Sequence, residues 1–159
     1  MRKRIGLVIL TIGCFGLLFG TAVATLPSGQ TLILKARGTV GPIDVKHNGI
    51  VLRRTEGRRA DVAVATVKFD PGASSGWHHH PGVVLVVVQR GTLTHYNPRC
   101  HKRHYSKGDV LVEAGNKPGL VRNNGSVEVV AQATFIVPTQ TPAEGLRIDD
   151  PQPQGCSAS

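Results

Sequence analysis

Three consecutive histidines, His78, His79 and His80, are the strongest chemical signal in the chain. On a β-strand, side chains two residues apart point to the same side, so His78 and His80 share one face and His79 points away. Two neutral imidazoles at that spacing can bind one metal ion, and they suit Fe, Mn, Ni, Cu or Zn. Because two ligands alone make a weak site, at least one more must come from elsewhere. The sequence therefore predicts an incomplete site for a divalent transition metal.

The segments that must position these histidines are typical of strands and turns. Turn signals such as Asp70-Pro71-Gly72 and Pro81-Gly82 separate β-branched runs, and no window holds a convincing amphipathic helix. Strands are expected at residues 31–36, 50–53, 62–69, 83–88, 92–96, 110–112, 120–122 and 127–137. The run from Val83 to Val88 is apolar at every position, which predicts a strand within a sheet that is covered on both faces. The whole pattern predicts an all-β sandwich or barrel.

Two stretches of the sequence resemble the motifs of the cupin superfamily. The first motif is carried by Gly72, His78, His80, Pro81-Gly82 and Gly91, and the second by Gly108-Asp109 and Arg122-Asn123. The matching segment covers about residues 66–138, and the chain is similar to the small secreted cupins often called quercetin-dioxygenase-like. The resemblance implies a double-stranded β-helix, or jelly-roll barrel. Residues 25–159 would form a single cupin domain with an extended C-terminal tail over 139–159.

The chain also departs from the family pattern. The resemblance implies a metal site of three histidines and one glutamate. Val84 occupies the glutamate position, and Gly119 occupies the position of the last histidine. Of the four family ligands, the chain therefore keeps only His78 and His80.

His95 is the residue that we expect to fill this gap. Leu93 should face the core, and His95, two residues later, would then lie on the same inner face. The hairpin through residues 89–91 should place His95 near Val86, one inward position from Val84. The alternative is that His95 faces solvent or hydrogen-bonds in a polar pocket. The candidate metal ligands are therefore His78, His80 and His95.

The other polar residues of the sequence indicate no further chemistry. His101 and His104 are expected on a surface loop within the polar stretch 97–107. Acidic residues are scarce and scattered, and Glu113 simply follows the strand expected at 110–112. No Gly-x-Ser-x-Gly elbow supports nucleophilic catalysis, so the catalytic residues stay unknown.

Residues 1–24 have the character of a secretory signal peptide. A basic head, Met1–Arg4, precedes an apolar run, Ile5–Gly20, and small residues follow at Ala22-Val23-Ala24. The apolar run is shorter than the roughly 20 residues that span a bilayer, which favours cleavage over a retained anchor. Lipid attachment at Cys14 is a further alternative. We expect a secreted protein, extracellular or periplasmic, without stable membrane insertion after cleavage.

The two cysteines that lie outside the predicted signal peptide, together with the net charge, indicate a disulfide and the kind of partner to expect. In an oxidising compartment, Cys100 and Cys156 are expected to form one disulfide. The chain carries 19 Lys and Arg against 10 Asp and Glu, and this positive charge favours anionic partners. Aromatic residues make up only 4% of the chain, which leaves few stacking platforms for bases, so no nucleic-acid partner is expected.

Together these observations favour a secreted cupin with a degenerate metal site, acting as a small-molecule-binding or weakly metal-binding module. Val84 and Gly119 replace two ligands, and the valine-rich walls suit an apolar guest. One alternative is a metal-dependent dioxygenase or isomerase that uses the histidine-rich site. Another is a basic protein that interacts with the cell envelope. The family resemblance is compatible with a homodimer.

Overall fold

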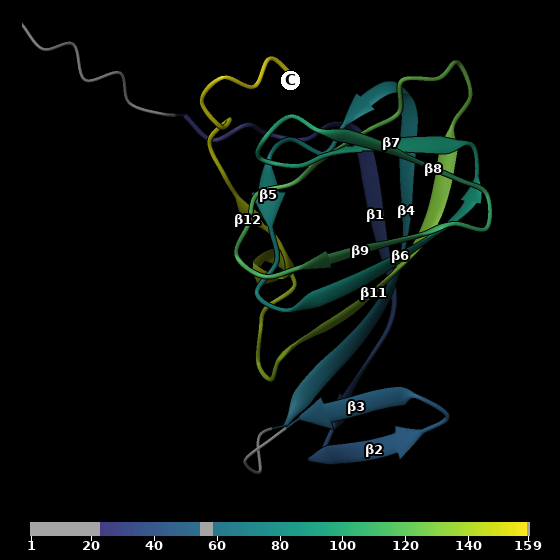
Figure 1. Ribbon diagram of the computed structural model, residues 1–159, viewed down its shortest axis with the longest axis vertical. Helices are drawn as coiled ribbons and strands as arrows, with labels where there is room; N and C mark the ends of the chain where they lie inside the picture. Colours follow the sequence, from purple (N-terminus) through teal and green to yellow (C-terminus); the bar gives the residue numbers. More distant parts are fainter. Residues whose placement is uncertain (1–22, 55–58, 159) are drawn as a thin grey trace, which may run out of the picture.

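The computed structural model describes residues 23–54 and 59–158, so all but the last two residues of the predicted signal peptide lie outside the described residues. Twelve strands and one short 3-10 helix are present in this part of the chain (Figure 1). They are β1 (Ser28–Val40), β2 (Ile43–His47), β3 (Ile50–Arg54), β4 (Ala60–Ser74), β5 (His78–His79), β6 (Val83–Arg90), β7 (Thr92–Tyr96), β8 (Lys102–Ser106), β9 (Val110–Ala114), β10 (Leu120–Arg122), β11 (Val129–Pro138), η1 (Glu144–Leu146) and β12 (Ile148–Asp149). Within the described ranges, no helix has the length and apolar character needed to cross a membrane.

Eight strands form one antiparallel sheet that curls into a nearly closed barrel, as the predicted jelly roll requires (Figure 1). The strand order is β8-β7-β10-β4-β11-β6-β9, and β1 pairs with β4. The long strand β4 pairs with β11 from Ala60 to Phe69, whereas its last residue, Ser74, pairs with Arg122 of β10. Gly72 lies between the two stretches with a φ of +79°, a left-handed conformation that glycine adopts at little cost. One strand can therefore contribute to both halves of the barrel.

Alternate positions of the central strands fill the barrel core. β6 buries every second residue from Val84 to Val88, and β11 does so from Val129 to Val137. On the outer face, Val83 and Val87 are 38% and 41% exposed. The prediction that residues 83–88 are covered on both faces is therefore wrong. β6 does lie between two partner strands, β11 and β9, but the barrel covers only its inner face.

The predicted hairpin between β6 and β7 is also wrong. β7 pairs with β10 and β8, so His95 lies opposite Val121 and Arg103 rather than near Val86. The turn after β6 carries the chain to the other half of the barrel, whereas a tight hairpin would have kept both strands side by side. His104, which was expected on a loop, lies on the edge strand β8.

The C-terminal segment crosses the outside of the histidine segment. In Figure 1 this segment, residues 142–158, runs beside β5, and we call it the C-terminal strap. β12 within the strap pairs antiparallel with β5, with Ile148 opposite His79 and Asp149 opposite His78. The tail thus forms part of the wall around the histidines.

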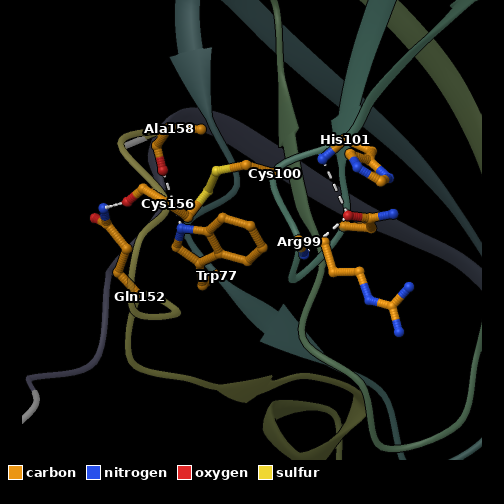
Figure 2. Close-up of a disulfide and its surroundings, with 8 residues drawn as sticks. Trp77, Arg99, Cys100, His101, Gln152, Cys156 and Ala158 are labelled. Carbon is orange, nitrogen blue, oxygen red and sulfur yellow. Dashed lines mark hydrogen bonds between the residues drawn. A yellow bond between two sulfur atoms is a disulfide. The ribbon is translucent and has the colours of Figure 1, made fainter.

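A disulfide and a buried tryptophan fasten the end of the strap. The expected bond between Cys100 and Cys156 is present, with the two Cα atoms 5.3 Å apart. Trp77 is fully buried against Cys156, and its indole Nε1 donates a hydrogen bond of 3.0 Å to the carbonyl oxygen of Ala158 (Figure 2). Disulfides of this kind are typical of proteins in oxidising compartments.

Replacing both cysteines should lower the free energy of unfolding. The two residues are 56 positions apart, and closing a loop of that length is worth about 4 kcal/mol on the chain-entropy argument. Urea denaturation of the Cys100→Ser/Cys156→Ser variant, beside the oxidised wild type, measures this loss. Reductant should destabilise the wild type similarly and leave the variant unchanged. Equal stability of the oxidised wild type and the variant would contradict the assignment.

Candidate metal centre

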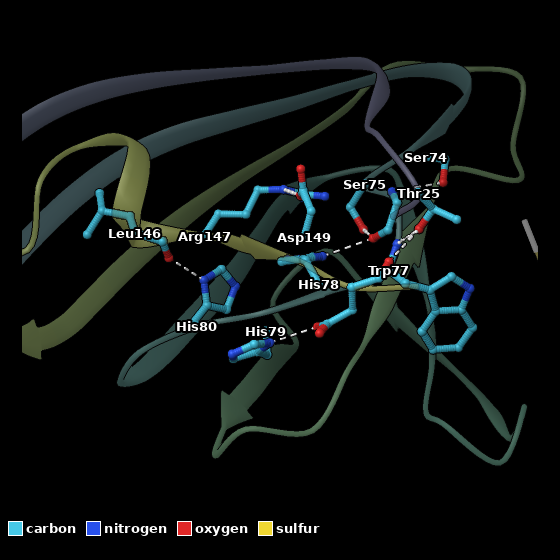
Figure 3. A network of polar contacts seen from close by, with 12 residues as sticks. Thr25, Ser74, Ser75, Trp77, His78, His79, His80, Leu146, Arg147 and Asp149 are labelled. Carbon is cyan, nitrogen blue, oxygen red and sulfur yellow. Dashed lines mark hydrogen bonds and ion pairs between the residues drawn. The ribbon is translucent and has the colours of Figure 1, made fainter. Parts of the chain in front are cut away.

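Backbone groups hold the two inner histidines in place. His78 exchanges two backbone hydrogen bonds, of 3.0 and 2.8 Å, with Gly119. The ring Nδ1 of His78 lies 2.9 Å from the carbonyl oxygen of Gly76, and that of His80 lies 2.6 Å from the carbonyl oxygen of Leu146 (Figure 3). Because a carbonyl can only accept, each ring carries a proton on Nδ1 and, when neutral, presents the lone pair of Nε2. Metal-binding histidines are commonly oriented in this way.

His79 points away from the other two histidines, as the alternation along a strand predicts. Its Nδ1 lies 2.8 Å from Oδ2 of Asp150, within the C-terminal strap (Figure 3). This contact ties the outer histidine to the strap, so that all three consecutive histidines have a fixed partner.

Glu113 brings a carboxylate to the two inner histidines. The potential ligand atoms of His78, His80 and Glu113 lie within 4.8 Å of one another, and Nε2 of His80 is 3.4 Å from Oε2 of Glu113. Sequence reasoning missed this residue. The signal was the two-residue period of β9, in which Leu111 is buried between exposed neighbours and Glu113 takes the next inward position.

The strand register explains where this carboxylate comes from. Glu113 stands directly opposite Val84 in the antiparallel pair of β9 and β6. Side chains in such positions have Cβ atoms about 5 Å apart and point to the same side of the sheet. Val84 occupies the position at which the cupin resemblance expects glutamate. The neighbouring strand therefore supplies a carboxylate to the place where the family pattern lacks one.

His95 lies beside this cluster, on the neighbouring part of the inner face. It is half-buried on β7, and a Cβ atom added to Gly119 would lie 2.9 Å from its Nε2 and 3.7 Å from Oε1 of Glu113. His95 thus fills the space that a side chain at position 119 would need. His95 is not one of the three residues, His78, His80 and Glu113, whose potential ligand atoms lie within 4.8 Å of one another. Its role as a ligand stays a prediction.

Two cavities meet at the cluster. The larger, of about 270 Å³, has mainly apolar walls that include Val84, Phe135 and Leu146. The smaller, of about 180 Å³, is lined in part by His95. His78, His80 and Glu113 line both cavities. A metal ion held by these three side chains would therefore adjoin a space suited to an apolar guest.

Burial and charge shape the protonation of the cluster. Burial lowers the pKa of His78 to about 4, although the nearby Glu113 charge opposes this shift. Burial also lowers the pKa of His95, again opposed by Glu113. Burial alone would raise the pKa of Glu113, but its hydrogen bond with His80 and the three surrounding imidazoles outweigh burial and lower it. The site at neutral pH combines a carboxylate with a neutral His78, as metal binding requires.

The barrel matches a known protein family. Residues 65–137 match the family model described as a cupin domain. This segment makes up somewhat less than half of the chain, and its similarity to the cupin domain agrees with the barrel fold. None of the curated proteins compared with the chain matches its sequence.

Solved structures with a similar fold include three of interest. A cupin-like protein from Thermotoga maritima is 27% identical, with 57% of this chain and 65% of that chain covered and a TM-score of 0.47. A recombinant oxalate oxidase in complex with glycolate is 22% identical, with 46% and 41% covered and a TM-score of 0.43, so the match spans under half of that chain. A predicted oxalate decarboxylase from Thermotoga maritima is 19% identical, with 50% and 81% covered and a TM-score of 0.43.

The metal-free protein should lose stability as the pH falls from about 6.5 to about 4. In this window the unfolded chain takes up a proton on His78 that the folded chain does not, so acid favours unfolding. Complete loss of this contribution corresponds to about 3 kcal/mol, and His95 shifts stability in the same direction. Urea denaturation at several pH values measures the slope, which His78→Asn should reduce. An unchanged slope in that variant would refute the assignment.

Proposed function

We propose that the protein binds one divalent transition metal ion through His78, His80 and Glu113, beside a cavity that accepts a small, largely apolar molecule. The 3.4 Å separation between Nε2 of His80 and Oε2 of Glu113 carries the proposal. Since Nδ1 of His80 donates to Leu146, a neutral His80 would turn the lone pair of Nε2 toward the carboxylate, and a proton or a metal ion between the two atoms stabilises this arrangement. Two ligands with bonds of about 2.1 Å to one ion lie about 3 Å apart, close to this separation.

The donor set indicates which metals suit the cluster. Two imidazoles and one carboxylate form the combination typical of non-haem Fe(II) sites, and Mn, Ni, Cu and Zn also accept these ligands. A bound ion would act as a Lewis acid and leave further coordination positions for a guest. The chain itself orients His78 and His80 through carbonyl groups and supplies the negative charge of Glu113.

A metal-dependent dioxygenase or isomerase is the second candidate. It is favoured by the position of the cluster, because His78, His80 and Glu113 line the apolar cavity directly and a guest there would lie next to the ion. Turnover separates the two candidates. A binding module returns its guest unchanged, whereas an enzyme of this class converts it only while the metal is present.

Metal titration tests the proposed site. Untagged, metal-depleted protein titrated with Co²⁺ should bind one equivalent per chain. Glu113→Gln and His80→Asn should each weaken Co²⁺ binding by at least about 10- to 100-fold. Loss of a group that only orients a metal ligand already costs about this much, and each of these variants removes a direct ligand. Isothermal titration calorimetry gives both the stoichiometry and the affinity.

Matched controls separate the site from loose surface binding. Glu128→Gln removes a carboxylate that pairs with Arg90 at the surface, and His104→Ala removes an exposed histidine. Neither should alter the affinity by more than about twofold, since neither residue lines the cluster cavities. If Glu113→Gln binds Co²⁺ as tightly as the Glu128→Gln control, the proposed ligand set is wrong.

A further inference from the structure

Arg147 places a positive charge on the wall of the larger cavity. It follows Leu146, whose carbonyl holds His80, and its side chain is 23% exposed. Among the lining residues that the structure describes, it is the sole Lys or Arg. It is close enough to His78 for its charge to contribute to the lowered pKa of that ring. A cation thus lies beside the candidate metal centre within mainly apolar walls.

Only some of the N–H donors of the Arg147 guanidinium group have a hydrogen-bond acceptor among the described residues. Its Nε donates to Oδ1 of Asp149 at 2.5 Å (Figure 3). Its Nη2 is buried and has no hydrogen-bond partner among residues 23–54 and 59–158. A guanidinium carries five N–H donors in a planar fork, and native proteins rarely leave a buried donor unmatched. Asp149 therefore accounts for one edge of the group, and no acceptor among the described residues meets Nη2.

We infer that the guest of the larger cavity is a small organic acid, whose carboxylate pairs with Arg147 while its hydrocarbon part contacts the apolar wall. This inference deepens the proposed function, because it rests on the cavity receiving a small molecule. The planar guanidinium matches a carboxylate in geometry and forms strong, charge-assisted hydrogen bonds with it.

The surrounding charges favour a single negative charge on the guest. Arg147 already shares its charge with Asp149, and Glu144 lies exposed at the edge of the same cavity. A doubly charged group such as a phosphate would meet one partly neutralised cation and two carboxylates on the cavity wall, those of Glu144 and Glu113. A monocarboxylate needs less compensation, and the apolar remainder of the cavity suits its hydrocarbon body.

Binding of a matched acid and amide tests the inference. Benzoate and its neutral counterpart benzamide are titrated into the metal-free, full-length mature protein at neutral pH, followed by ligand-observed NMR. Leaving out metal removes any attraction between the carboxylate and an ion. We expect benzoate to bind at least about tenfold more tightly than benzamide, since hydrogen bonds to charged groups are stronger than those between neutral groups. Arg147→Met should abolish this preference, and Arg147→Lys should retain part of it.

Arg90→Met provides a control with the same change in net charge. Arg90 is an exposed residue that pairs with Glu128 and does not line the cavity, so the preference for benzoate should persist. Equal binding of acid and amide, binding of neither, or a preference that survives Arg147→Met would overturn the inference. A guanidinium that only anchors the strap through Asp149 would give the first of these results.

Titration of the same preparations with Co²⁺ separates the inference from the proposed function. Arg147→Met should bind Co²⁺ at least as tightly as the wild type, because Arg147 is not one of the proposed ligands and its positive charge lies close to His78. If the wild type prefers benzoate but binds no Co²⁺, the metal proposal fails and the acid-binding inference stands. If the wild type binds Co²⁺ but does not prefer benzoate to benzamide, the metal proposal stands and the acid-binding inference fails.

Discussion

The close approach of His80 and Glu113 depends on three separate parts of the chain. His80 follows β5, while the pairing of β9 with β6 sets Glu113 opposite Val84 and turns it inward. The carbonyl of Leu146, in the C-terminal strap, fixes the ring orientation of His80. Nε2 of His80 and Oε2 of Glu113 lie 3.4 Å apart, and a proton or a metal ion between them stabilises this approach. The fold thus creates a position that a positive charge stabilises.

Part of this arrangement is local and could be predicted from the sequence. The shared face of His78 and His80 follows from the two-residue period of a strand, and the barrel follows from recurring β-branched runs and turn signals. Glu113 was missed because its place beside the histidines depends on a strand register that joins distant segments. β8 was missed because an edge strand with exposed Lys102 and Arg103 resembles a polar loop in sequence.

The C-terminal strap shows a second limit of sequence reasoning. The Cys100–Cys156 disulfide follows from cysteine counting in an oxidising compartment, but the contacts that the strap makes do not. Leu146 acts through its backbone carbonyl, which every residue possesses, so its type gives no signal. Arg147 is charged, yet only the folded structure shows that it lines the cavity and that one of its buried nitrogens has no hydrogen-bond partner within the part of the chain that the structure describes. The strap is thus part of the candidate site as well as a cover over the barrel.

The central claim is that Glu113, supplied by the strand beside the family glutamate position, completes a metal centre with His78 and His80. A crystal structure of the protein grown with Co²⁺, with anomalous data collected at the cobalt edge, tests this claim most directly. The account predicts one anomalous peak per chain, about 2.0–2.3 Å from Nε2 of both histidines and from a carboxylate oxygen of Glu113. A peak that excludes Glu113, or one found only at surface histidines such as His101 or His104, would contradict it.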